Sequence, residues 1–329
     1  MKHKHLQYLC DPETQETLIL EDAVYDGDEI VSGTLRSTSN TYPITKGIPR
    51  FVKDEGYSDN FGYQWNRWAQ VQFEDQNVGG SMQGHTTAMF DAITQFSAEK
   101  LRGKTVLDMG CGPGRFTDVA LSMGASVIAL DYSSAIDAAQ ANFSGKDADI
   151  LFVQGDALRL PLKADSVDYS FSIGVLHHTP SPATGVREAH RVTREGGQFA
   201  IRVYSANGFY TYPSVRFWRS IFLALKPLLG HYPPLAYSYL FGSIGYGLGK
   251  IWRPLSYPLR AVFPTVFLPD YRWAILDTFD AIATTHQSGH TPDEIEGWLR
   301  SAGFKKIIHK HENDFVTEKS NVAPLGIDL

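Results

Sequence analysis

The stretch VLDMGCGPG, residues 106–114, decides the fold of this chain of 329 residues. Its first four residues read as an apolar β-strand that carries one acid, Asp108, and a GxGxG loop follows. Glycines let the backbone turn tightly and approach a ligand without a Cβ in the way. A loop of this kind, between a parallel strand and a helix, is typical of sites that bind an adenosine-type cofactor.

The spacing of the glycines distinguishes between kinds of cofactor. A dinucleotide-binding loop follows the pattern G-x-G-x-x-G/A, whose third small residue lets the helix pack closely on the strand. Counted from Gly110, that position holds Arg115, and the third glycine comes one residue earlier, at Gly114. The spacing therefore disfavours an NAD-dependent oxidoreductase.

Further segments with strand character follow the glycine loop and alternate with helical stretches. The second strand closes on Asp131, which lies 21 residues past Gly110, near the usual distance for a carboxylate that holds ribose hydroxyls. The third closes with Gly-Asp-Ala at 155–157, and His177 and His178 follow the fourth. The expected strand segments after the loop are 125–131, 150–157, 165–172, 195–203 and 304–309.

This alternation predicts an α/β fold with a doubly wound, mostly parallel sheet that is covered by helices on both faces. Right-handed crossovers bring the loops after the strands to one edge, where ligands bind at the switch in strand order. The sequence TPDE at 291–294 is a capping box with proline at the first helical position, so it predicts the start of a helix that ends at Gly303.

Taken in order, the glycine loop, Asp131, the Gly-Asp-Ala segment and the histidine pair resemble the motifs of class I S-adenosylmethionine-dependent methyltransferases. The resemblance covers residues 101–205 best and residues 286–310 less closely. It implies a seven-stranded sheet, S-adenosyl-L-methionine as cofactor, and in-line methyl transfer to a small-molecule or lipid-like acceptor. The cofactor-binding residues that it implies are Asp108, Gly110, Cys111, Gly112, Gly114, Asp131, Tyr132, Asp156, Ala157 and Ile173.

Each acid in this set has a role implied by the resemblance and a structural alternative. Asp131 would accept hydrogen bonds from the ribose hydroxyls, or else cap a helix at residues 133–134. Asp156 would accept from the adenine amine, or else hold a turn. Asp108 would orient the loop toward the cofactor's amino group, or else only tie down the loop's N–H groups.

The two histidines are the predicted catalytic residues. His177 or His178 would act as the base if the acceptor must lose a proton, because a histidine is the usual base near neutral pH. The alternative is that both hold the loop by bonding to backbone carbonyls. Arg202, Tyr204 and His290 are weaker candidates for contacts to the acceptor.

The bulk composition excludes several classes of protein. A formal net charge of −6 argues against a surface that binds nucleic acid as a whole, and 43% hydrophobic residues support a sizeable core. Two cysteines exclude a disulfide framework and fit a reducing cytoplasm. Neither the apolar core of a signal peptide nor an uninterrupted span of about 20 apolar residues is found, so we expect a cytoplasmic protein, with membrane association as an alternative.

Residues 1–55 predict a small β-rich domain. The motif YPITKGIPRF at 42–51 resembles the end of the zinc-ribbon-like domain that precedes the catalytic domain in some bacterial methyltransferases. That domain usually carries two Cys-x-x-Cys knuckles, whose positions cannot supply a four-ligand zinc site here, so no metal is expected. A residual metal site would have to use His3, His5 and Cys10. The residues at the knuckle positions are Asp11, Thr14, Arg36 and Ser39.

The rest of the chain divides into three expected units. Residues 56–100 form a helical linker or lid, whose aromatic cluster at 61–68 either packs on the sheet or meets the cofactor's sulfonium in a cation–π contact. Residues 101–205 and 270–329 form the methyltransferase domain. Residues 206–269 interrupt that domain as an insertion.

The insertion has an unusual composition, with six Lys and Arg residues, no acid and many aromatic side chains. Pro233 and Pro234 would break a membrane-spanning helix here. Three interpretations remain open: a helical cap over an apolar acceptor, a surface for a homodimer, and an interfacial segment in peripheral contact with a membrane.

Two other functions remain possible on the same fold. One is transfer of another group from a modified S-adenosylmethionine. The other is a non-catalytic binding module, against which the intact loop, Asp131 and Asp156 argue.

Overall fold

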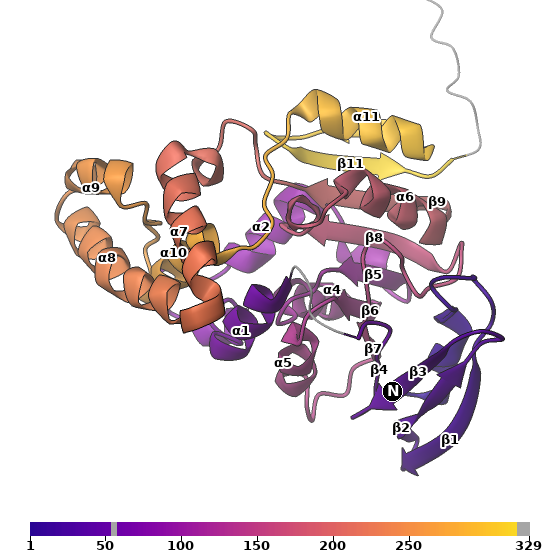
Figure 1. Cartoon of the computed structure of the whole chain (residues 1–329). Helices are drawn as coiled ribbons and strands as arrows, with labels where there is room; N and C mark the ends of the chain where they lie inside the picture. The colour runs from indigo at the N-terminus through magenta and orange to yellow at the C-terminus, as the bar shows by residue number, and fades with distance from the viewer. Residues whose placement is uncertain (54–57, 321–329) are drawn as a thin grey trace, which may run out of the picture.

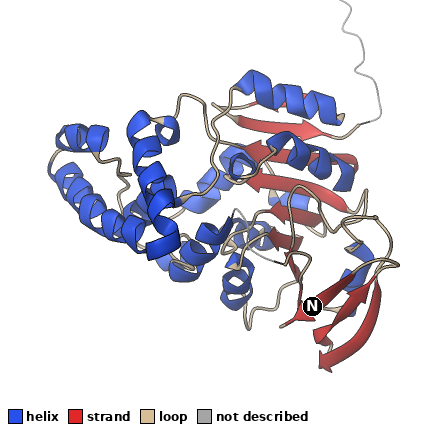
Figure 2. Cartoon of the chain, in the orientation of Figure 1, coloured by secondary structure: helices blue, strands red, loops and turns tan. Residues whose placement is uncertain are grey.

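The computed structural model describes residues 1–53 and 58–320, whose strands form two separate sheets (Figures 1 and 2). The larger sheet has seven strands in the order β10-β11-β9-β8-β5-β6-β7. The pairs from β9 to β7 are parallel, and β11 is antiparallel to both of its neighbours. The strands are β5 (Thr105–Met109), β6 (Ser126–Asp131), β7 (Ile150–Gln154), β8 (Val167–Ile173), β9 (Thr193–Arg202), β10 (Lys305–His309) and β11 (Asp314–Glu318).

This topology confirms the predicted doubly wound, mostly parallel sheet. The chain runs outward from β5 through β6 to β7 on one side and from β8 to β9 on the other, so the strand order switches between β5 and β8. Ligands bind at such a switch, beyond the carboxyl ends of the strands. Every predicted strand segment contains a strand, whereas β11 was not located from the sequence.

The two faces of the sheet pack against different layers. Successive residues of a strand point to opposite faces, so Leu107 packs in a core with α6 and α11, and Val106 packs in a core with α2 and α4. The predicted capping box is confirmed, because the Thr291 hydroxyl accepts from the Glu294 N–H and the Glu294 carboxylate accepts from the Thr291 N–H. The helices near the sheet are α2 (His85–Thr94), α3 (Ala98–Leu101), α4 (Arg115–Ser122), α5 (Ala135–Asn142), α6 (Pro182–Val192) and α11 (Pro292–Ala302).

The smaller, antiparallel sheet belongs to the N-terminal domain. It joins the large sheet beside β7, where Arg50 bridges to Gln154, and its apolar side chains share the core of Leu107. Its strands are β1 (Ile19–Asp26), β2 (Glu29–Arg36), β3 (Thr41–Thr45) and β4 (Ile48–Pro49).

A buried carboxylate ties the loops of this domain together. Asp11 accepts hydrogen bonds from the Ser37 hydroxyl, the Asn40 amide, the Tyr42 hydroxyl and the backbone N–H of Glu13. Although burial opposes ionisation, the bonds from Ser37 and Asn40 lower the pKa of Asp11 to about 2. Ser37 and Asn40, which bond to Asp11, therefore each lie one residue past Arg36 and Ser39, the residues predicted to occupy the second knuckle.

The residues considered for a residual metal site have other partners. The His5 Nε2 atom lies 3.0 Å from an Asp149 carboxylate oxygen, and the Cys10 thiol donates to the side-chain oxygen of Gln15. Within residues 1–53 and 58–320, no group of three or more His, Cys, Asp or Glu side chains is arranged to hold a metal ion.

A layer of helices forms the side of the molecule away from the N-terminal sheet (Figure 1). Here α10 packs against α1, α7 and α8, so it lies with the helices of the insertion although the sequence analysis assigned it to the 270–329 unit. No helix in the described part of the chain is long and apolar enough to cross a membrane. The helices of the layer are α1 (Asp59–Arg67), α7 (Pro213–Leu229), α8 (Tyr232–Ile251), α9 (Ser256–Val262) and α10 (Tyr271–Ala283).

Short 3-10 turns connect these elements. The expected boundary between residues 55 and 56, and the last part of the 270–329 unit from residue 321 onward, lie outside the described residues. The turns are η1 (His3–Tyr8), η3 (Glu74–Asn77), η4 (Leu176–His178), η5 (Phe209–Thr211) and η6 (Arg253–Leu255).

Candidate active site

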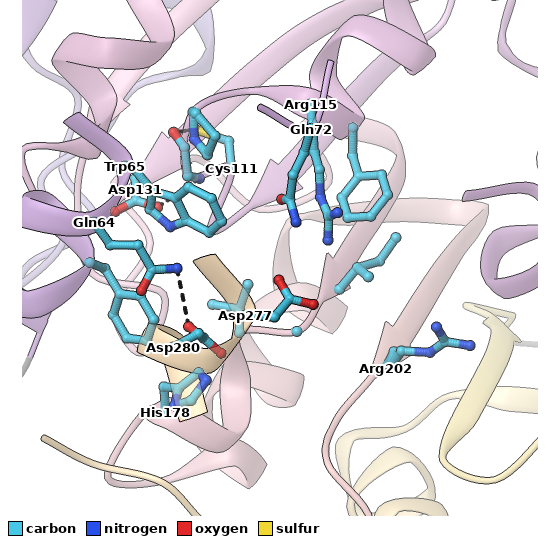
Figure 3. A pocket seen from close by; sticks show the side chains of 18 of the residues that line it. Gln64, Trp65, Gln72, Cys111, Arg115, Asp131, His178, Arg202, Asp277 and Asp280 are labelled. Atoms are coloured by element: carbon cyan, nitrogen blue, oxygen red, sulfur yellow. Dashed lines mark hydrogen bonds between the residues drawn. The ribbon is translucent and has the colours of Figure 1, made fainter. Parts of the chain in front are cut away.

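A cavity of about 330 Å³ opens at the switch in strand order, between the sheet and the helical layer (Figure 3). The loops after β5, β6 and β8 form one wall, which we call the sheet wall. Helices α1 and α10 form the opposite wall, which we call the helical wall. The lining residues of the sheet wall are Gly110, Cys111, Gly112, Pro113, Asp131, Tyr132, Ile173, Gly174 and Val175.

The glycine loop is held by backbone hydrogen bonds and leaves no room for a side chain at Gly110 or Gly112. The N–H groups of Gly110 and Cys111 both donate to the Leu130 carbonyl, at 2.8 and 2.9 Å. Gly110 has a φ of +91°, and a Cβ there would lie 2.3 Å from a methyl carbon of Val175. A Cβ on Gly112 would lie 3.1 Å from the Trp65 indole nitrogen. The loop therefore requires glycine for its conformation and its space.

Asp131 reaches the cavity from the end of β6 and also shapes the loops. One of its carboxylate oxygens accepts from the Gly112 N–H at 2.9 Å, and the other accepts from the N–H and the hydroxyl of Ser133 at 2.9 and 2.7 Å. Asp131 is 9% exposed and lines the cavity. The structure thus places Asp131 in the cavity lining and bonds it to the loops on both sides, whereas Ser134 is the N-cap residue of the helix α5 that follows.

Asp108 lies under the loop rather than in the cavity lining. Its carboxylate is buried and accepts from the Thr117 hydroxyl of α4 at 2.7 Å. Burial raises the pKa of this carboxyl group to about 7. Its contacts are those of a residue that anchors the loop to the helix behind it.

The remaining predicted cofactor residues divide into two groups. Ala157, Tyr132 and Ile173 line the cavity, as do Cys111 and the first two glycines. Asp156 and Gly114 are not among the lining residues. Asp156 accepts from the Leu158 N–H at 2.8 Å, which is the turn contact of its alternative interpretation.

The histidine pair is split between the core and the cavity. His177 is fully buried outside the lining, its Nδ1 accepts from the Tyr204 N–H, and burial lowers its pKa well below the usual value. His178 lines the cavity, and its Nδ1 lies 2.9 Å from the His286 carbonyl oxygen. Because a carbonyl only accepts, Nδ1 of His178 carries the proton, and Nε2 is the acceptor of the neutral ring. Burial lowers the pKa of His178 and so favours this neutral form.

The helical wall contributes acids that the sequence analysis did not single out. Asp277 and Asp280 lie one turn apart on α10, and the Asp280 carboxylate accepts from the Gln64 amide at 3.2 Å and the Tyr204 hydroxyl at 3.0 Å. Asp277 lies between Asp280 and Arg115 in the cavity (Figure 3). Burial and the nearby Asp280 raise the pKa of Asp277 to about 7. The i, i+3 spacing of two acids in an otherwise apolar helix was the available signal.

Other candidates of the sequence analysis have structural partners. Phe61 and Trp65 of the aromatic cluster line the cavity, whereas Trp68 packs edge-on against Phe279. Three further residues were weaker candidates: Arg202 lines the cavity and pairs with Asp314, Tyr204 also lines it, and His290 bonds to Ser288 outside the lining.

Comparison with known proteins identifies the central part of the chain. Residues 107–201 match the family model described as a methyltransferase domain. An uncharacterised methyltransferase of Mycobacteroides abscessus is 36% identical over 109 residues, which are 32% of this chain and 42% of the relative. A demethylmenaquinone methyltransferase of Beutenbergia cavernae is 31% identical over 144 residues, which are 43% of this chain and 58% of the relative.

A solved S-adenosylmethionine-dependent methyltransferase of Mesorhizobium loti is also similar, with 29% identity and a TM-score of 0.33 over 42% of this chain and 58% of that one. The matched segments cover between 33% and 58% of the length of the two curated relatives named above and of two further uncharacterised methyltransferases, from Arabidopsis thaliana and Mycobacterium ulcerans. The matched domain holds the glycine loop, Asp131 and the histidine pair, and it forms the centre of the seven-stranded sheet. The family match therefore identifies residues 107–201 as a methyltransferase domain, and these residues contain β8 and most of β5 and β9 in the seven-stranded sheet.

Proposed function

We propose that the cavity binds S-adenosyl-L-methionine and that the protein transfers its methyl group to a small-molecule or lipid-like acceptor. The observation that carries the proposal is the bond between Asp131 and the Gly112 N–H in the sheet wall, at the carboxyl ends of β5 and β6. It sets a carboxylate beside a loop in which Gly110 and Gly112 present no side chain, as a nucleoside with two ribose hydroxyls requires. When bound, the cofactor would supply a methyl group that is already activated by its sulfonium.

The far end of the cavity fits the amino-acid part of this cofactor. Arg115 and Asp277 have opposite charges and both line the cavity. Within residues 1–53 and 58–320, neither side chain forms an ion pair. We therefore assign the methionyl carboxylate to Arg115 and the ammonium group to Asp277, since a cationic partner favours the ionised form of a carboxyl group.

The acceptor would enter between His178 and Asp280 of α10. The Nε2 atom of the neutral His178 ring would accept the proton of the acceptor hydroxyl or amine that receives the methyl group. Tyr204 and Asp280 are bonded to each other beside this histidine and offer polar contacts to the acceptor. Most of the rate enhancement would come from alignment, for which well-oriented reactants gain roughly 7–11 kcal/mol.

Calorimetric titration with S-adenosylhomocysteine and with 5′-methylthioadenosine, which lacks the amino-acid part, tests the two ends separately. Asp131→Asn should weaken both ligands about 10- to 100-fold, since it removes a charge-assisted acceptor. Arg115→Gln should weaken S-adenosylhomocysteine about tenfold and leave 5′-methylthioadenosine unchanged. Asp118→Asn is the matched control, because Asp118 lies on the surface of α4 and pairs with Lys146.

The proposal fails if the wild-type protein binds neither ligand, or if Asp131→Asn binds both as tightly as the control does. Circular dichroism should be unchanged in all three variants, so that a loss of affinity is not a loss of fold. If Arg115→Gln weakens both ligands equally, the assignment of the amino-acid end is wrong while the nucleoside site stands.

A further inference from the structure

The outer surface of the insertion carries most of the exposed large apolar side chains of the molecule. Of the 19 such residues in the described part of the chain, 13 belong to residues 206–269. We call these 13 residues the outer apolar face. They are Tyr212, Phe217, Leu228, Leu229, Tyr232, Tyr239, Leu240, Ile244, Ile251, Trp252, Leu255, Tyr257 and Val262.

Helix α8 shows that this exposure is built into the fold. From Ser238 onward its buried residues are small, and they lie so close to their neighbours that a Cβ on Gly242 would lie 2.9 Å from Ile275 and one on Gly249 would lie 2.3 Å from the Phe267 ring. The large side chains therefore lie on the other side, where Leu240 and Ile244 are 57% and 43% exposed. A helix that is apolar on both sides is normally buried on both.

Cations accompany this apolar surface at the end of α8. Residues 250–253 read Lys-Ile-Trp-Arg, and all four are exposed, with Ile251 at 77% and Trp252 at 62%. Two cations thus flank two large apolar side chains along one short segment. Aromatic and aliphatic side chains beside Lys and Arg are typical of surfaces that sit in the headgroup region of a bilayer.

The distribution of charge in the chain favours an anionic partner for the outer apolar face over a second copy of the chain. The insertion contributes +6 from its Lys and Arg residues and has no acid, and the whole chain carries −6, so the rest of the chain carries −12. Of these six cations, Lys226 is paired with Asp59 of α1, and the other five form no ion pair in the described part of the chain. Two copies that met through the same face would bring two groups of cations together, which disfavours a symmetric dimer. An anionic lipid surface attracts these cations and covers the apolar side chains at the same time.

We propose that the outer apolar face, centred on residues 250–253, docks the protein on the surface of an anionic lipid bilayer. Docking is peripheral, since no described helix can span the bilayer. In Figure 1, α8 and α9 lie at the edge of the molecule farthest from the N-terminal sheet, so a flat surface can approach them without meeting that domain. The proposal does not depend on the cofactor or on the identity of the acceptor.

Flotation of the full chain with lipid vesicles tests this docking. The protein should float with vesicles of phosphatidylcholine that contain about a third phosphatidylglycerol, and less with phosphatidylcholine alone. Raising the salt from about 0.1 to about 0.5 M should lower the bound fraction, because screening weakens the attraction of the cations. Absence of binding to the anionic vesicles at low salt would overturn the proposal.

Paired variants locate the docking face. The double variant I251S/W252S should lower the partition coefficient on anionic vesicles about tenfold or more. The double variant K250Q/R253Q should lower it about fivefold for each charge removed and leave binding to neutral vesicles unchanged. The matched controls are I19S/Y25S, which removes two exposed apolar side chains of β1, and R300Q/K306Q, which removes two cations near β10.

The controls should bind like the wild type, and circular dichroism should show that every variant is folded. Equal losses in the β1 control and in I251S/W252S would overturn the proposal, because the binding would then not be specific to this face. Light scattering adds the test for a second copy. A dimer that I251S/W252S abolishes, in a protein that ignores anionic vesicles, would replace the bilayer with self-association.

Discussion

The sheet wall and the helical wall of the cavity are built in different ways. In the sheet wall the backbone is fixed by its own hydrogen bonds, and Asp131 is bonded to Gly112 and Ser133. The helical wall presents side chains across the cavity, and the buried side-chain oxygen of Gln64, like that of nearby Gln72, has no protein partner in the described part of the chain.

This difference separates two tasks. Backbone geometry suits the part of a ligand that never varies, whereas side chains on added helices can differ from one protein to the next. Gln64 and Asp280 are 216 residues apart in sequence and meet only because α1 and α10 pack together. We therefore expect changes in the sheet wall to cost stability, and changes in the helical wall to alter charge and ligand choice.

The largest effect should come from a methyl group added to the sheet wall. Gly110→Ala forces an L side chain into a left-handed conformation and places its Cβ against Val175, so the free energy of unfolding should fall by about 2–4 kcal/mol. Gly174→Ala is the matched control: its φ is +77° but no atom lies within 4 Å of the added Cβ, so it should cost only about 1 kcal/mol. Urea denaturation measures both, and equal costs would show that the close contact does not limit the loop.

A change in the helical wall should alter how the free energy of unfolding depends on pH. The pKa of Asp277 is raised from 3.8 to about 7 in the folded protein, so the folded state holds a proton that the unfolded state has lost between these values. Stability therefore falls as the pH rises from about 4 to about 7. Asp277→Asn removes this loss, and its advantage over the wild type should grow by about 1–3 kcal/mol between pH 4 and pH 8.

Urea denaturation at several pH values measures this advantage. Asp108 also has a raised pKa, so part of the pH dependence should persist in the variant. An advantage that stays constant from pH 4 to pH 8 would mean that Asp277 is ionised throughout in the folded protein.

The smallest effect should come from a hydroxyl that links the helical wall to the end of β9. Tyr204 follows β9 and donates to Asp280 of α10, so Tyr204→Phe should lower the free energy of unfolding by about 1–2 kcal/mol. A double-mutant cycle with Asp280→Asn isolates this bond. Additive losses would show that the hydroxyl stabilises the protein through other contacts.

The sheet wall was largely predictable from the sequence, because its signals are local. The glycine spacing follows from backbone conformation, and the apolar runs at 125–131 and 195–203 are strands because both of their faces are buried. Asp131 was predictable for the same reason, since it lies at a fixed distance from Gly110 in one βαβ unit.

The helical wall was not predictable, because its residues are brought together by packing over long separations in sequence. The spacing of Asp277 and Asp280 sets these acids apart in the sequence, but it does not show that they face a cavity, because that depends on the packing of α10 against α1. The histidines illustrate the same limit. Nothing in the sequence tells His178, which reaches the cavity, from His177, which the core encloses.

The buried carboxylate of Asp11 makes the stability of the N-terminal domain sensitive to low pH. Donors from three segments, the turn after Asp11, the loop before β3 and β3 itself, converge on one carboxylate, and its negative charge is lost when the group is protonated. Since the pKa of Asp11 is lowered to about 2 in the folded state, its contribution is complete near neutrality and disappears as the pH falls from about 4 to about 2. Lowering the pH through this range should therefore destabilise the N-terminal domain.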